Sequence, residues 1–123
     1  MRATLSNYHQ SPRKVRLVAD LIRGKSVRDA RLALQYLPKK SSPVIVKLLD
    51  SAVANARSRG ATADTLFVKK ITVDKGAVLR RYRPFARGRA GSVRKTMSIV
   101  NLELGTIAPK APKRARSSNS PKT

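Results

Sequence analysis

Basic side chains gather in the stretch between Asp74 and Glu103, which contains no acidic residue. A guanidinium group donates two parallel hydrogen bonds to a phosphate, and an ammonium group adds a compact positive charge. The basic residues of this stretch are Lys75, Arg80, Arg81, Arg83, Arg87, Arg89, Arg94 and Lys95. Such a set, with no carboxylate to neutralise it, is suited to binding a phosphate-rich polyanion.

The residues around these cations predict two paired strands joined by a turn. They are rich in β-branched and aromatic types, among them Tyr82 and Val93, which favour strands. At the centre, Gly88 and Gly91 can both adopt positive φ and turn the chain. We therefore expect a long β-hairpin over about residues 76–102, with a basic tip.

The first arm of this hairpin has charge on both faces, because arginine occurs at odd positions (Arg81, Arg83) and at an even one (Arg80). A protein core would not bury such an arm, since unpaired buried charge is too costly. An isolated hairpin is also only marginally stable in water. We expect the hairpin to protrude, to be mobile in the free protein and to become ordered on a folded nucleic acid.

The overall charge points to the same class of partner. The chain has 123 residues, with 28 Lys and Arg against 6 Asp and Glu, a net charge of +22 and a pI near 11.8. Such a protein attracts polyanions. Anionic membranes are also polyanions, but no segment joins a wide apolar face to a basic one, and no apolar run approaches a membrane span. We expect no membrane partner and no small-molecule substrate.

The sequence gives little support for catalysis or for a metal or cofactor site. The chain has no cysteine and a single histidine, His9, and its carboxylates are scattered, so we expect no enzyme, no metal site and no cofactor. The segment Gly24-Lys25-Ser26 lacks the second glycine and the preceding strand of a phosphate-binding loop. The start also lacks the apolar segment of a signal peptide, so the protein is expected to stay where it is made.

Hydrophobic periodicity predicts the elements that must carry the hairpin. The expected ranges are a strand at 1–10, helices at 12–23, 26–37 and 42–58, and a strand at 66–73 that continues into the hairpin. Ser11 and Ser26 are predicted N-caps, and Gly24 is a predicted left-handed helix end. The apolar positions change phase between Val68 and Ile71, which indicates a bulge or a strand buried on both faces.

The predicted fold class is α+β, with three helices packed on a small antiparallel sheet, a long protruding β-hairpin and a basic disordered C-terminal tail. Residues 1–104 form the single predicted domain. Residues 105–123 contain three prolines, five basic residues and few apolar ones, so the tail should not fold alone.

Several sequence blocks resemble one known family. The longest runs from Ser11 to Lys25 (SPRKVRLVADLIRGK), a second is 51–56 (SAVANA), and further matches occur at Val73-Asp74, Gly76, Pro84, Ala86, 88–90 and 94–96. They closely resemble, in matching order over about residues 5–104, the universal ribosomal protein numbered twenty-two of the large subunit, in its bacterial type. The tail lies outside this resemblance.

The resemblance implies a cytoplasmic protein of the ribosome that binds large-subunit ribosomal RNA and aids subunit assembly. Its globular part would lie near the exit of the nascent-peptide tunnel, and the hairpin tip would line the tunnel. Neighbouring large-subunit proteins and, transiently, the nascent peptide would be further partners. The implied tip is Pro84, Phe85, Ala86, Arg87, Gly88, Arg89 and Ala90. The candidate RNA-binding residues are Arg13, Lys14, Arg16, Lys25, Lys75, Arg80, Arg81, Arg83, Arg87, Arg89, Arg94 and Lys95.

The sequence departs from this family at a few positions. Lys75 stands where the family commonly has glutamate, and Phe85 stands where a tip arginine is usual. Met97-Ser98 replaces a Ser-His pair, and Val100 replaces a threonine. A second interpretation of the same residues is an architectural nucleic-acid-binding protein that uses a basic β-hairpin on DNA. Binding to duplex DNA as strong as binding to ribosomal RNA would favour it.

Overall fold

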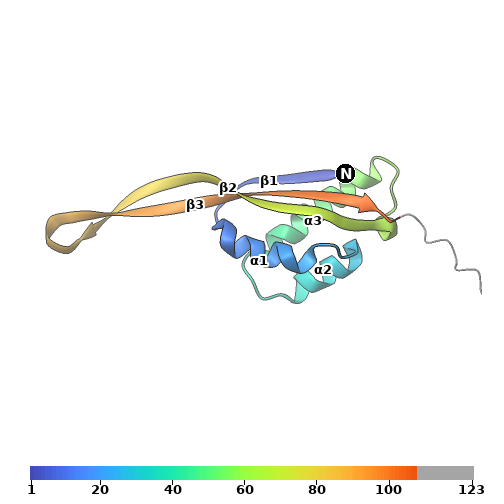
Figure 1. Ribbon diagram of the computed structural model, residues 1–123, viewed down its shortest axis with the longest axis horizontal. Coiled ribbons are helices and arrows are strands. Elements are labelled where there is room, and N and C mark those ends of the chain that lie inside the picture. The colour runs from blue at the N-terminus through green and yellow to red at the C-terminus, as the bar shows by residue number, and fades with distance from the viewer. Residues whose placement is uncertain (108–123) are drawn as a thin grey trace, which may run out of the picture.

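Three helices pack on one face of an antiparallel sheet, and two of its strands continue outward as a hairpin (Figure 1). The structure is a computed structural model and describes residues 1–107. Its elements are β1 (Arg2–Tyr8), α1 (Pro12–Ile22), α2 (Val27–Tyr36), α3 (Ser42–Arg57), the 3-10 turn η1 (Ala63–Thr65), β2 (Leu66–Phe85), the 3-10 turn η2 (Ala86–Gly88) and β3 (Arg89–Thr106). The predicted α+β class is confirmed.

The sheet has the strand order β1-β3-β2, so β3 is central and pairs antiparallel with both neighbours. Leu102 in β3 lies opposite Ala3 in β1 and Ile71 in β2. The register shifts between Val68 and Lys70, so of the two alternatives predicted there, a bulge or a strand buried on both faces, the structure has the bulge. A second shift, between Lys75 and Val78, was not predicted and lies where the sheet becomes the hairpin.

The core lies between the sheet and the helices. Each helix contributes its apolar stripe, with Ile22 of α1, Leu34 of α2 and Leu49 of α3 almost completely buried. From the sheet, Leu66 and Leu102 close this core from the other side. The core ends at Val73 in β2 and at Met97 in β3, and no residue from 74 to 96 is buried. We refer to residues 75–96 as the hairpin and to the rest of the described chain as the globular part.

The helix boundaries follow local sequence signals, with one exception. Ser26 accepts a hydrogen bond from the Asp29 amide at 3.1 Å, and Gly24 adopts φ +76°, both as predicted. The prediction that the Ser11 side chain caps α1 was wrong, because its hydroxyl makes no capping hydrogen bond. The Lys14 amide, which that hydroxyl would reach, donates instead to the Ser11 carbonyl at 3.2 Å.

The end of β3 differs from the predicted start of the tail. Gly105 and Thr106 belong to β3 and pair with Phe67 and Leu66 of β2. A Cβ atom at position 105 would approach the Phe67 ring to 2.8 Å, so a larger residue there would displace that ring. Most of the predicted tail, residues 108–123, lies outside the described residues.

Candidate nucleic-acid interface

The register of the hairpin fixes which residues lie opposite its arginines, and none of these cross-strand partners is acidic. Arg80 and Arg94 are direct cross-strand partners, a pairing of like charges that destabilises an isolated sheet. Leu79 lies opposite Lys95, and Arg81 lies opposite Val93. The described ion pairs, Arg2–Glu103, Arg23–Asp20 and Arg31–Asp50, all lie in the globular part. An anion bound by both side chains, Arg80 and Arg94, would relieve the repulsion between them.

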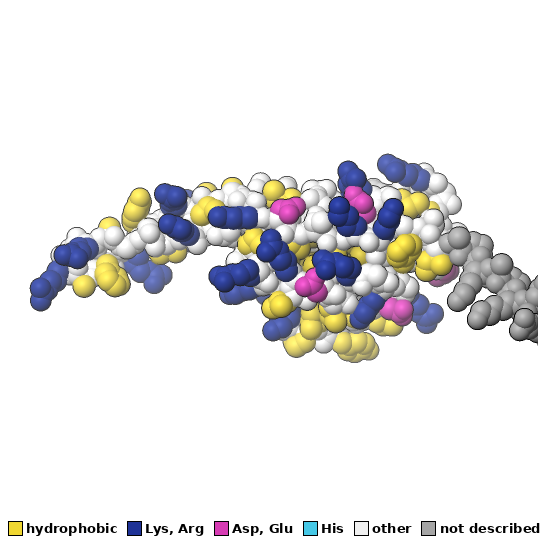
Figure 2. Space-filling model, in the orientation of Figure 1, with side chains coloured by type: hydrophobic (Ala, Val, Ile, Leu, Met, Phe, Trp, Pro, Cys, Tyr) yellow, Lys and Arg dark blue, Asp and Glu magenta, His cyan; other side chains and the backbone are white. Residues whose placement is uncertain are grey.

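Both faces of the hairpin carry positive charge, as the sequence predicts. Successive residues of β2 alternate in direction, so Arg81 and Arg83 lie on the face opposite to Arg80. Every residue from Arg80 to Ala90 is exposed. Figure 2 shows basic side chains along the hairpin, whereas the acidic side chains visible in that view lie on the globular part. The hairpin therefore presents cations on both faces to solvent.

The tip is formed by η2 and the residues on either side of it. Arg87 and Gly88 adopt left-handed conformations, with φ of 54° and 72°. The prediction that Gly91 turns the chain was wrong, because it lies in β3 opposite Arg83 and has no positive φ. The left-handed arginine costs about 1 kcal/mol relative to glycine. The turn therefore contains one residue, Arg87, whose backbone is strained by its own side chain.

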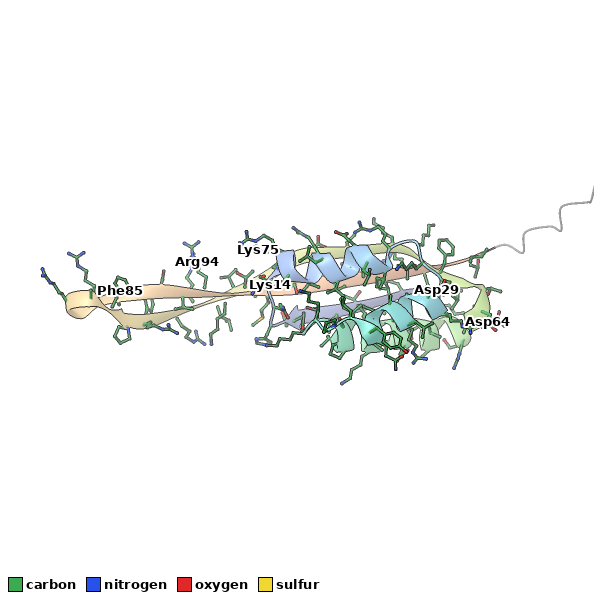
Figure 3. All side chains as sticks on the ribbon, turned by 90° about the horizontal axis from the view of Figure 1, so that it is seen from below. Lys14, Asp29, Asp64, Lys75, Phe85 and Arg94 are labelled. Atoms are coloured by element: carbon green, nitrogen blue, oxygen red, sulfur yellow. The ribbon has the colours of Figure 1, made fainter. Side chains whose placement is uncertain are left out.

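Two aromatic rings lie exposed at this end of the molecule. Tyr82 has 73% and Phe85 has 71% of its surface exposed. Figure 3 shows Phe85 at the far end of the hairpin. A shallow hollow at this end is lined by Tyr82, Arg83, Pro84, Gly88, Arg89 and Ala90. Exposed rings beside arginines are suited to stacking on a base or on a guanidinium plane.

The candidate residues of α1 divide into two groups. Arg13 and Lys14 are exposed on the first turn of α1. Figure 3 shows Lys14 near the point where the hairpin leaves the sheet. The guanidinium of Arg16 instead donates to the Val73 carbonyl, from Nε at 3.1 Å and from Nη2 at 3.0 Å. This contact ties α1 to β2 and leaves Arg16 fewer donors for an external partner.

Lys25 and Lys75 lie at opposite ends of the sheet. The Lys25 carbonyl accepts from the Val68 amide at 2.9 Å, near the start of β2 and far from the tip. Lys75 is exposed at the root of the hairpin, beside the second bulge (Figure 3). Lys75 therefore belongs to the hairpin and Lys14 lies close to its root, whereas Lys25 is apart from it.

Two basic residues that sequence reasoning missed, His9 and Lys40, lie beside two that it predicted, Lys14 and Arg94. They line one surface hollow although they are distant in the sequence. His9 is in the β1–α1 turn, and Lys40 is in the connection between α2 and α3. No local pattern joins these positions, so only the fold could reveal the cluster.

Within residues 1–107, no group of histidine and acidic side chains is arranged to hold a metal ion. In the same part of the chain, each helix is too short or too polar to cross a membrane.

Comparisons of the sequence with known proteins identify relatives of this chain. Residues 3–105 match the family model described as ribosomal protein L22p/L17e. The chain is 50% identical over 104 residues to the large ribosomal subunit protein uL22 of Geobacter metallireducens, covering 84% of this chain and 94% of that protein. It is 50% identical over 103 residues to the uL22 of Trichlorobacter lovleyi, covering 83% and 91%, and 49% identical over 108 residues to that of an Anaeromyxobacter species, covering 86% and 74%. A match over this much of the chain shows that it belongs to the ribosomal protein L22p/L17e family.

Proposed function

We propose that this protein is a non-catalytic structural component of the large ribosomal subunit, in the cytoplasm, and that it binds ribosomal RNA through the hairpin and aids subunit assembly. Its partners are large-subunit ribosomal RNA and neighbouring large-subunit proteins. Family membership supports the ribosomal structural role. The proposal of RNA binding rests on the side chains of the hairpin.

The observation that carries the RNA-binding proposal is the arrangement of unpaired cations along a two-stranded ribbon. Arg80 and Arg94 face each other, and Arg81 and Arg83 project from the opposite face. A flat partner would satisfy one face only. A folded RNA surrounds an inserted ribbon with phosphates on both sides, and guanidinium groups bind phosphates bidentately.

The length of the hairpin fits insertion into an RNA body. At about 3.3 Å per residue, the arm from Lys75 to Phe85 spans roughly 30 Å. We propose that the tip, residues 84–90, lines the nascent-peptide tunnel and contacts the nascent peptide transiently. The exposed Phe85 gives this tip an aromatic ring beside its arginines, and Tyr82 is exposed two residues before the tip.

The proposal is tested by comparing the binding of the full chain to large-subunit ribosomal RNA and to duplex DNA of similar length as salt is raised. With six to ten phosphate contacts, non-specific affinity falls roughly 10³- to 10⁵-fold between 50 and 200 mM salt. We expect ribosomal RNA to retain binding at a salt concentration that releases the DNA. Co-sedimentation with large subunits through a high-salt wash gives an independent measurement.

Equal loss of both ligands would contradict the proposal and favour the architectural DNA binder. Release of the protein from large subunits in the wash, together with tight binding to duplex DNA, would have the same meaning.

A further inference from the structure

A surface hollow of about 350 Å³ lies where the hairpin joins the globular part. We call it the junction hollow. It is lined by His9, Gln10, Ser11, Lys14, Lys40, Arg94 and Thr96. These residues come from the β1–α1 turn, the start of α1, the α2–α3 connection and β3. Four parts of the chain thus meet at one polar site.

The fold itself brings the three cations to this site. Pro12 starts α1 at the end of β1, so Lys14 lies on its first turn. The Ser42 amide donates to the Lys39 carbonyl at 3.0 Å and closes a turn that has Lys40 at its corner. Arg94 lies on the same face of β3 as Val100 and Leu102, the face that the helices cover, but beyond the edge of the core.

Within the described part of the chain, no acidic side chain balances the charge of the junction hollow. Its lining contains no aspartate or glutamate, and none of Lys14, Lys40 and Arg94 takes part in an ion pair within residues 1–107. Cations that converge without an acid between them repel one another. A bound anion would turn this repulsion into attraction.

The polar residues of the lining add hydrogen-bond donors. The Tyr8 hydroxyl donates to Gln10 Oε1 at 3.1 Å, which leaves the amide nitrogen of Gln10 available to an acceptor. The Ser11 hydroxyl is not used for helix capping. At about 350 Å³ and open to solvent, the hollow has room for a phosphate group with its substituents.

We propose that the junction hollow binds a backbone phosphate of RNA and thereby fixes the direction in which the hairpin leaves the globular part. This inference rests on the proposed function. RNA is favoured over an acidic protein segment because Arg94 belongs both to the hollow and to the cross-strand pair with Arg80. One strand of phosphates can therefore pass from the hairpin into the hollow without a gap in its contacts.

The single histidine of the chain offers a local reporter of this site. The imidazole resonances of His9 are to be followed by NMR in the full chain while an oligouridylate, inorganic phosphate or oligoglutamate is added. We expect a saturable shift with the oligouridylate, at a far lower concentration than with inorganic phosphate, because the RNA also contacts the hairpin.

Matched variants test whether the His9 shift depends on the lysines of the junction hollow. In the double variant Lys14→Ala and Lys40→Ala, the RNA concentration at half-saturation of the His9 shift should rise at least about tenfold, through the loss of charge-assisted contacts. The double variant Lys39→Ala and Lys47→Ala is the control, because it removes the same two charges at exposed positions outside the lining, and it should change that concentration less than about twofold. Circular dichroism checks that the variants, all at exposed positions, remain folded.

Three results would overturn the inference: His9 resonances that do not respond to RNA, an equal response in the double variant and the control, or a stronger response to oligoglutamate. Binding to large-subunit ribosomal RNA, measured on the same samples, separates this inference from the proposed function. If the wild-type chain prefers ribosomal RNA while His9 stays silent, only the junction hollow is misassigned. If that preference is absent, the proposed function fails.

Discussion

The inner and outer halves of β2 and β3 share a continuous backbone but differ in what their side chains contact. The inner halves contribute Ile71 and Leu102 to the core. The outer halves carry Arg80 and Arg94 opposite each other and bury nothing. Backbone pairing is therefore common to both regions, whereas apolar burial is confined to one. The difference shows that apolar burial stabilises the globular part alone, and we expect the hairpin to need a partner to become stable.

The largest expected difference between the two regions is in amide hydrogen exchange of the free protein. Amides around Leu102 should exchange only on global opening, which for a stability of 5–15 kcal/mol means protection of at least about 10³-fold. Amides from Arg80 to Lys95 should show little protection, because the ribbon has no apolar face. Strong protection there would mean that the hairpin is stable by itself.

Two leucine substitutions, one in each half of the strands, compare how much the two halves contribute to the free energy of unfolding. Leu102→Ala removes a side chain that is 0% exposed, and it should lower the free energy of unfolding by about 2–5 kcal/mol. Leu79→Ala, at a half-buried position in the outer half of β2, should lower it by only about 0.5 kcal/mol. Urea denaturation of both variants gives the comparison, and similar losses would show that the core extends into the hairpin.

Removal of charge from the hairpin should affect RNA binding and leave the fold intact. The triple variant Arg80→Ala, Arg81→Ala and Arg83→Ala should reduce the slope of log affinity against log salt by about 3, one for each phosphate contact. Its helical circular dichroism should equal that of the wild type. The control replaces Arg57, Arg59 and Lys69, which are exposed on the globular part, and should change the slope less. A loss of helix in the first variant would place the hairpin in the core.

The smallest effect on RNA affinity is expected at the tip. Replacement of residues 85–89 by Asn-Gly joins Pro84 to Ala90, which pair in the sheet, through a two-residue hairpin turn and removes Phe85, Arg87 and Arg89. The RNA affinity should fall less than in the triple variant, while crosslinking of a nascent peptide to the hairpin in reconstituted subunits should change. Complete loss of RNA binding would mean that the tip, not the arms, carries the RNA contacts.

The sequence predicted those features that depend on neighbouring residues. The Ser26 cap involves Asp29 only three residues away, and the bulge after Val68 follows from a phase change visible in the apolar pattern. The protruding hairpin was predicted because its charges exclude burial on either face. These features need no knowledge of distant parts of the chain.

Features that depend on competition or on distant contacts were not predicted. Ser11 does not cap α1 because its own carbonyl takes the amide that its hydroxyl would reach. Gly91 was assigned to the turn, but the register of β3 opposite Arg83 places it in a strand, and Arg87 adopts the left-handed conformation instead. The junction hollow joins residues 9, 14, 40 and 94, which only the packing of α1 and the α2–α3 connection against the sheet brings together.

The bulge between Lys75 and Val78 lies at the base of the hairpin. Beyond it, the two strands pair without a further register shift to the tip, so a change of angle at the bulge displaces the tip more than any other part of the hairpin. Over roughly 30 Å of strand at about 3.3 Å per residue, a tilt of about 10° moves the tip by about 5 Å. Substitutions near Gly76, where a Cβ atom would come within 3.4 Å of Ile99 and of the Met97 carbonyl, would therefore be felt most at the opposite end of the arm.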